Sequence, residues 1–292
     1  MEFRVLRYFL TVAHEESFSR AAEILHVSQS TLSRQIAQLE EELEVTLFKR
    51  TTRNVILTEQ GLLLRRRAEE LLSLAEKTEQ ELTHKGEGLE GTISIGSGEL
   101  EAFNFLADCI KSFSDQHPKV NFNIVTGTAD IIKERLENGL VDIGVLLEPV
   151  DTGKLEAYPF PSIEKYEVLM RKDDPLASLD EIRQKDLKGK MQIVPLRRVE
   201  AHKRWMGRYY DEKYFRFTSN LPTNAAILVS KGVGYYITVS GASAFSEKLG
   251  LVSKPIHGAR EWKVFLTWKR YQPNPLAVTR FIEYVLRELN MG

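Results

Sequence analysis

The stretch SQSTLSRQIAQLEEELEVTLFKRTTRN, residues 28–54, begins with hydroxyl and amide side chains and ends in a short basic segment. Ser28 is a favourable helix N-cap. Apolar residues follow at the spacing of one buried helical face: Leu32, Ile36, Leu39 and Leu43. The apolar period then becomes that of extended chain, and residues 46–49 and 55–57 predict a hairpin around a polar turn. The stretch therefore predicts a helix that leads into a β-hairpin.

Two further helices are predicted before this stretch. The first has apolar residues on one face: Phe3, Leu6, Phe9, Val12 and Ala13. Ser17 or Ser19 caps a short second helix, in which Ala21 and Ala22 are small enough to let another helix cross closely. Three helices followed by a hairpin predict a winged helix-turn-helix domain over residues 1–58.

A long helix is predicted next, over residues 59–89, with Thr58 as its N-cap. Six residues follow one another by steps of four and three, about 3.5 on average, as in a coiled-coil seam. They are Leu64, Ala68, Leu71, Ala75, Thr78 and Leu82. We expect this linker helix to dimerise the chain.

Residues 90–292 alternate between strand and helix patterns. Strands are expected near 92–95, 120–124 and 142–145, with helices near 101–115 and 129–138 between them. A second run of such units covers about 163–265, and an extended segment at 262–268 and an amphipathic helix end the chain. This succession predicts an α/β domain with a mainly parallel sheet.

Composition narrows the function classes. The chain has 292 residues, a formal net charge of -1, 42% hydrophobic residues and one cysteine, Cys109. One cysteine excludes an internal disulfide and a multi-cysteine metal site, and the histidines lack metal-binding spacing, so we expect no metal and no cofactor. We find no signal peptide and no apolar run near the roughly 20 residues of a membrane span, so we expect a cytoplasmic protein without a membrane partner.

The polar start of the third helix suits the readout of DNA bases. Short polar side chains let the backbone approach base edges, and Gln suits adenine while Arg suits guanine or a phosphate. The candidate DNA-binding residues are Ser28, Gln29, Ser30, Thr31, Ser33 and Arg34 on the helix, and Arg50 and Arg53 on the hairpin. A merely solvated helix start explains Ser28, but it does not explain the polar positions that follow.

Residues 3–61 closely resemble the DNA-binding segment of LysR-type transcriptional regulators. The motifs SFSRAAEILHVSQSTLSRQIAQLEEELEVTLFKR and VILTEQG carry this resemblance, and HPKVNFNIVTG, LENGLVDIGVL, DDPLA and VSKGVGYYI match the family's effector-binding domain more loosely. Two residues depart from the family pattern: Glu44 stands where glycine is usual, and Asp174 where histidine is frequent. We expect either a strained left-handed Glu44 or a helix that ends differently.

The resemblance implies a two-lobed α/β domain like the type II periplasmic binding proteins, with a ligand between the lobes. Lobe I would comprise about 90–161 and 267–292, and lobe II about 162–266. Ligands in such sheets lie beyond the carboxyl ends of the strands. The candidate effector-binding residues are Ser97, Gly98, Glu99, Thr126, Thr128, Leu147, Arg197, His202 and Thr223, although a cap or turn role suits each of them equally.

The charge of the effector stays open at the level of sequence. Arg197, Arg198 and His202 suit a carboxylate, whereas Glu99 and Glu148 suit an amine or an amino acid. The function expected is a sequence-specific, DNA-binding transcriptional regulator, modulated by a small molecule. Its expected partners are double-stranded promoter DNA, further copies in a homodimer or homotetramer, and, as a candidate, RNA polymerase. The alternative is a solute-binding or enzymatic α/β domain fused to a DNA-binding module; because no common catalytic motif is present, we expect no enzymatic activity.

Overall fold

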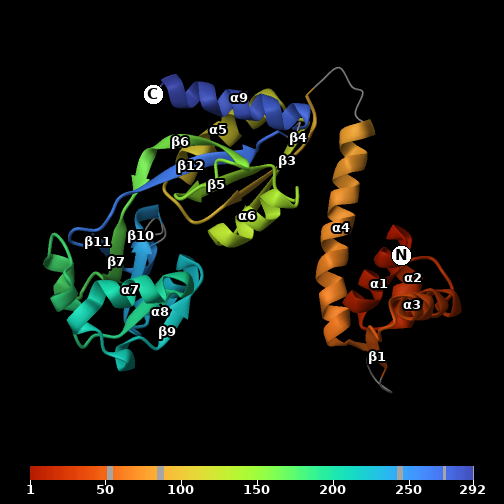
Figure 1. The fold of residues 1–292 in the computed structure, drawn as a ribbon, viewed down its shortest axis with the longest axis horizontal. Coiled ribbons are helices and arrows are strands. Elements are labelled where there is room, and N and C mark those ends of the chain that lie inside the picture. The colour runs from red at the N-terminus through yellow and green to blue at the C-terminus, as the bar shows by residue number, and fades with distance from the viewer. Residues whose placement is uncertain (51–54, 84–88, 242–245, 272–273, 292) are drawn as a thin grey trace. The chain divides into compact units, whose positions relative to one another are not determined.

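In the computed structural model the chain folds as two units, residues 1–85 and 86–292 (Figure 1). The structure describes residues 1–50, 55–83, 89–241, 246–271 and 274–291.

The first unit is a helix-turn-helix with a short hairpin and a long helix. Its elements are α1 (Phe3–Glu15), α2 (Phe18–Ile24), α3 (Gln29–Leu43), β1 (Phe48–Arg50), β2 (Val55–Leu57) and α4 (Glu59–Thr83). Strands β1 and β2 pair antiparallel. Ser17, rather than Ser19, caps α2 by accepting from the backbone N–H of Arg20, and Ser28 caps α3 by accepting from that of Thr31 at 3.1 Å. The winged helix-turn-helix prediction agrees with this arrangement.

The core of the first unit lies between α1, α2, α3 and the hairpin. Its most enclosed side chains include Leu6, Phe9, Leu32, Ile36, Leu39 and Leu47. The prediction of burial is wrong for two residues: Phe3 is 54% exposed and Leu43 is 37% exposed. Both lie in a terminal turn of their helix, where fewer neighbouring elements cover the apolar face.

Helix α4 uses its predicted seam differently from expectation. Ala68 is fully buried in the core of the same unit and Leu64 packs against that core, while Arg7 on α1 lies 3.6 Å from Glu76 on α4. By contrast, Leu71 and Leu74 are exposed. The heptad pattern thus combines an internal face toward α1 with a separate exposed apolar face, because one helix can carry two apolar stripes.

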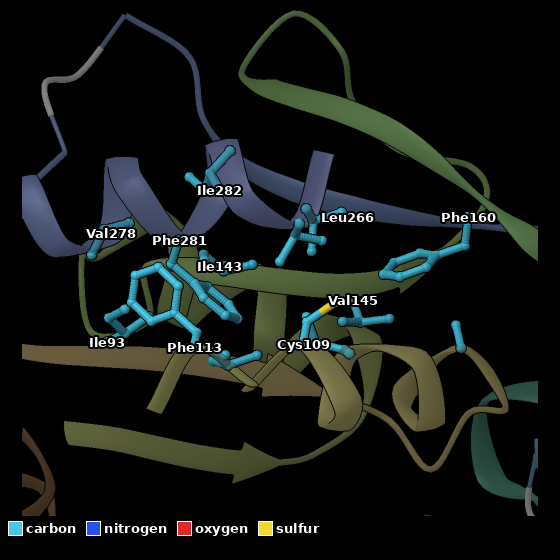
Figure 2. Close-up of a cluster of buried hydrophobic side chains, with 14 of the residues drawn as sticks. Ile93, Cys109, Phe113, Ile143, Val145, Phe160, Leu266, Val278, Phe281 and Ile282 are labelled. Atoms are coloured by element: carbon cyan, nitrogen blue, oxygen red, sulfur yellow. The ribbon is translucent and has the colours of Figure 1, made fainter. Parts of the chain in front are cut away.

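The second unit contains two mixed five-stranded sheets (Figure 1). The first sheet has the order β4-β3-β5-β12-β6 and defines lobe I. Its strands are β3 (Gly91–Ser97), β4 (Val120–Thr126), β5 (Ile143–Leu147), β6 (Leu155–Glu164) and β12 (Trp262–Lys269). Helices α5 (Ala102–Gln116) and α9 (Leu276–Met291) cover one face, and α6 (Ala129–Glu137) covers the other. Figure 2 shows the core under α5 and α9, where Phe113 meets Phe281 with ring centroids 5.1 Å apart.

The second sheet has the order β11-β7-β10-β8-β9 and defines lobe II. Its strands are β7 (Tyr166–Arg171), β8 (Gln192–Pro195), β9 (Phe217–Ser219), β10 (Tyr235–Val239) and β11 (Leu251–Pro255). Its helices are α7 (Val199–Met206) and α8 (Pro222–Ser230). Short 3-10 helices occupy Pro175–Ser178, Gln184–Leu187, Leu196–Arg198, Gly207–Tyr209, Glu212–Tyr214 and Glu247–Leu249.

Two details of the predicted α/β domain are corrected. Among the described strands, parallel pairing joins β3, β4 and β5 in one sheet and β8, β9 and β10 in the other, while β6, β7, β11 and β12 pair antiparallel. The chain passes between the lobes from β6 to β7 and from β11 to β12. Because β12 begins at Trp262 in the first sheet, lobe II ends near residue 261 and not at 266.

Candidate nucleic-acid interface and ligand cavity

The start of α3 presents a polar edge to solvent. Ser28, Gln29, Ser30 and Arg34 are exposed, and Thr31 and Ser33 are half-buried, on the side of the helix away from the core. Ser19 on α2 donates to the carboxamide oxygen of Gln29 at 3.1 Å. Within the described part of the chain, the guanidinium of Arg34 has no ion-pair partner. The structure therefore brings the six predicted helix residues together on one accessible edge.

The hairpin is tied to α3 by a residue that the sequence analysis did not single out. The Glu40 carboxylate accepts from the backbone N–H groups of Leu47 at 2.6 Å and Phe48 at 3.1 Å. This carboxylate satisfies two donors where the chain turns into β1. Glu40 belongs to the family-like run that follows Ser28, and that membership was the available signal for its role.

Thr58 and Gly61 attach α4 to the same place. The Thr58 hydroxyl donates to the carbonyl of Thr46 at 2.6 Å and accepts from the N–H of Gly61 at 2.9 Å, which confirms Thr58 as the cap. A Cβ atom on Gly61 would lie 2.2 Å from the carbonyl oxygen of Leu47. Glycine is therefore required for this close approach.

Of the two candidate DNA-binding arginines on the hairpin, only the backbone of Arg50 lies within the described residues. Arg50 ends β1, where its backbone pairs with Val55. Its side chain and the whole of Arg53 lie outside the described residues.

Glu44 ends α3 in the left-handed conformation, with φ 54° and ψ 34°. Its N–H donates to the carbonyl of Glu41, and the N–H of Val45 donates to that of Glu40. This is the Schellman arrangement in which glycine is normally found. Of the two alternatives that the sequence left for Glu44, the strained left-handed residue is the one observed.

A cavity of about 280 Å³ lies between the two lobes of the second unit. Five predicted effector-binding residues line it: Gly98, Glu99, Thr128, Leu147 and Arg197. The first turns of α6 and α8 also open on it, and neither helix has a side-chain cap. Apolar wall residues include Leu100, Val145, Tyr236 and Val239.

The other four predicted residues do not line this cavity. Ser97 is buried and donates to the carbonyl of Gly98 at 2.7 Å, and Thr126 is exposed at the end of β4. Thr223 acts through a cavity residue, since its hydroxyl in lobe II donates to Glu99 in lobe I at 2.7 Å.

His202 was expected to supply charge to the cleft, and its environment argues against that role. It is buried in lobe II, its Nε2 lies 2.8 Å from Oε1 of Gln192, and its ring lies against Trp205 and Phe215. Burial lowers the pKa of His202 from 6.5 to about 4. The imidazole is therefore neutral near pH 7 and acts as a core side chain.

Ionic contacts connect the lobes around the cavity. Arg197 in lobe II lies 3.4 Å from Asp130 on α6, and Arg260 lies 3.2 Å from Glu148 after β5. Arg198 makes no such pair among the described residues; its guanidinium lies 4.7 Å from the ring centroid of Trp262 and 5.8 Å from that of Tyr166. Burial raises the pKa of the Tyr166 hydroxyl, although Arg198 acts in the opposite direction.

A buried carboxylate holds the lobes together where the chain passes from β6 to β7. Glu164 is fully buried and accepts from the N–H of Glu101 in lobe I at 2.6 Å. It also accepts from the hydroxyl of Ser240 at 2.7 Å and the N–H of Gly241 at 2.9 Å, both in lobe II. A Cβ atom on Gly241 would lie 2.0 Å from the backbone nitrogen of Glu101. Nothing in the local sequence around Glu164 indicated this role.

Two family models match almost the whole chain. Residues 3–62 match the bacterial regulatory helix-turn-helix protein of the lysR family, and residues 86–290 match the LysR substrate binding domain. The chain belongs to the LysR family. The sequence-based assignment of family and fold is confirmed.

Relatives of this LysR-family chain carry regulator names. It is 30% identical over 254 residues to the HTH-type transcriptional regulator YtlI of Bacillus subtilis, and the matched segment covers 84% of this chain and 81% of YtlI. It is 35% identical over 196 residues to the uncharacterized HTH-type transcriptional regulator YvbU of the same species, 66% of each chain. With several other relatives the match spans only 50 to 59% of their length.

Full-length solved structures share the fold of this LysR-family chain. The crystal structure of full-length CbnR complexed with its target DNA matches with a TM-score of 0.71 at 22% identity, over 98% of this chain and 99% of that one. In the described part of this chain, no helix is long and apolar enough to cross a membrane, and no group of three or more His, Cys, Asp or Glu side chains could hold a metal ion.

Proposed function

We propose that this LysR-family chain is a sequence-specific DNA-binding transcriptional regulator whose activity responds to a small molecule bound between the lobes. The observation that carries the proposal is the solvent-facing polar edge of α3, Ser28 to Arg34, on a rigid helix-turn-helix core. A second unit of the same chain holds a cavity between its two lobes. The proposal assigns that cavity to binding and not to catalysis.

The chemistry of the polar edge suits the major groove. Gln29 can bond adenine in a bidentate manner, and Arg34 can bond guanine or a phosphate. The hydroxyls of Ser30, Thr31 and Ser33 can contact phosphates, and so can the free amides at the start of α3. Arg50 and Arg53 would hold the sugar-phosphate backbone beside the groove.

Further copies of the chain are proposed partners. A lone helix-turn-helix unit reads only a half-site, and a two-fold dimer reads an inverted repeat. The exposed leucines of α4 offer an apolar surface for dimerisation, and two dimers would form a tetramer. RNA polymerase at the promoter, in the cytoplasm of a bacterial cell, is the further partner implied by a regulatory role.

Selection from a random-sequence DNA pool with the purified full-length protein tests this function. We expect enrichment of an interrupted inverted repeat, and specific binding roughly a thousandfold or more tighter than binding to unrelated DNA. Binding with no enriched sequence, or turnover of a metabolite without specific DNA binding, would overturn the proposal.

A further inference from the structure

The charged side chains of the cavity are not equally available to a ligand. Five of them line it: Lys133, Arg197, Arg198, Glu99 and Glu148. Arg197 is paired with Asp130, and Glu148 is paired with Arg260 and accepts from the N–H of Lys263. Among the described residues this leaves Lys133, Arg198 and Glu99 without an opposite charge. The net charge of these three side chains is positive.

Three neighbouring side chains of the cavity wall have donors with no acceptor in the described part of the chain. They are Tyr166, Arg198 and Trp262, here called the donor cluster. The Arg198 guanidinium lies over both rings, and the two rings meet edge to face with centroids 6.1 Å apart. The indole Nε1 of Trp262 has no partner and is closed off from solvent, so the accessible donors of the cluster belong to Arg198 and Tyr166, and the ring face of Trp262 supports the Arg198 guanidinium.

The donor cluster stands where the chain passes between the lobes. Tyr166 is the first residue of β7 in lobe II, and Trp262 is the first residue of β12 in lobe I. The uncapped first turn of α6, where Ala129 lines the cavity, adds backbone N–H groups, whereas α8 begins with Pro222, which has no N–H to offer. Unsatisfied donors therefore dominate the wall, and the second carboxylate oxygens of Glu99 and Glu148 are the main opposing acceptors.

We infer that the cavity selects a small organic anion with an apolar body, and that the donor cluster binds its carboxylate or an equivalent anionic group. This inference rests on the proposed function, because it names the class of effector for the same cavity. An arginine held on two aromatic rings keeps its charge and its fork of donors in place for a carboxylate. The apolar body would contact Leu100, Val145 and Val239.

Matched sets of ligands on one carbon skeleton test the charge class. Phenylacetate, phenylacetamide and phenethylamine form one set, and hexanoate, hexanamide and hexylamine form another. Each is added at millimolar concentration to the full-length protein, and thermal unfolding is followed, since a ligand that binds the folded state raises Tm. We expect the carboxylates to raise Tm more than their amides, and the amines to have no effect. Amines acting more strongly, or no carboxylate exceeding its amide, would overturn the inference.

Variants then locate the anionic group. Arg198→Gln should weaken the binding of the stabilising carboxylate by at least about tenfold, and Trp262→Phe should weaken it to a smaller extent. Arg204→Gln is the matched control, because this exposed guanidinium on α7 does not line the cavity; it should change the affinity less than about threefold. Equal losses in the two arginine variants would contradict the assignment.

Glu99→Gln separates an anion from an amino acid. The amide oxygen can still accept from Thr223, so the contact between the lobes is retained while the negative charge is removed. We expect carboxylate affinity to be unchanged or higher. Loss of binding would instead mean that Glu99 holds a ligand ammonium group.

DNA selection on the same preparation distinguishes the two proposals. Carboxylate binding without specific DNA binding would refute the regulator and leave the anion site standing. Specific DNA binding together with selective amine binding would refute the anion site and leave the regulator proposal standing.

Discussion

Gln29 and Arg34 are the side chains on the polar edge of α3 whose chemistry is most specific for bases. Both are exposed, and they lie on a helix whose opposite side is fixed by Leu32, Ile36 and Leu39 in the core. The hydroxyl of Ser19 restrains Gln29 from the neighbouring helix. A rigid support of this kind lowers the entropy lost when the side chain meets a base.

Replacement of Gln29 by Ala tests the reading edge at a single residue. We expect the variant to lose about 1–3 kcal/mol of discrimination between the selected DNA and the same DNA altered at one base pair. Fluorescence anisotropy with labelled duplexes measures this difference. Gln38→Ala, also exposed on α3, is the control and should keep full discrimination. If the Gln29 variant discriminates as well as the natural protein, α3 is not the reading helix in the manner proposed.

His202 gives the second unit a pH-dependent stability. Its pKa is about 4 when folded and 6.5 when exposed, so the unfolded chain binds the proton more tightly. The stability is fully present above pH 6.5 and is lost progressively as the pH falls toward 4. Between pH 7.5 and pH 5 the loss should be about 2 kcal/mol in urea unfolding.

A His202→Phe variant is the comparison for this pH effect. Phe fills a similar volume and cannot be protonated, so the difference between the two pH values should shrink by the same amount. An undiminished pH dependence in the variant would assign the effect to other groups.

Among the elements, α3 is notable for how it ends. Helices α1 and α3 both end in a left-handed Glu, at Glu16 and Glu44. The sequence left two alternatives for the end of α3, and the structure shows the left-handed Glu44. The sequence could not predict whether Glu44 would bend the chain as glycine does, because the turn is also held by the Glu40 side chain, which accepts from Leu47 and Phe48 at the start of the hairpin.

Glu44→Gly should stabilise the first unit by about 1 kcal/mol, because glycine enters the left-handed region without a steric cost. Denaturant unfolding of the full chain, monitored through the first unit, measures the change. Glu41→Gly lies three residues earlier in the exposed helix and should destabilise by about 1 kcal/mol. Equal effects of the two substitutions would show that Glu44 carries no strain.

For the whole molecule, α4 supplies two apolar faces with different uses. Ala68 and Leu72 belong to the core of the first unit, and Leu71 and Leu74 remain exposed. The sequence predicted a dimerising helix and merged the two faces into one seam. Residue spacing alone could not separate the two faces, because the position of α1 in space decides which residues of α4 are buried.

A double variant, Leu71→Glu with Leu74→Glu, should convert the proposed oligomer to a smaller species. The charges would lie on the exposed apolar face of α4, where burial against a second copy becomes unfavourable. Sedimentation velocity measures the mass. Leu249→Glu, at another exposed leucine, should leave the mass unchanged. An oligomer that survives the double variant must be held by another surface.

The sequence by itself determined the helix-turn-helix, its Ser28 and Thr58 caps and the first strands and helices of the second unit, because caps and apolar periods act within a few residues. Five of the nine candidate effector-binding residues also line the cavity. Only the tertiary structure decided which charges in the cavity stay unpaired and how the lobes are joined. Glu164 reaches Glu101 and Gly241 across separations of 63 and 77 residues. Pairing and burial of charge depend on such distant neighbours, and no local pattern records them.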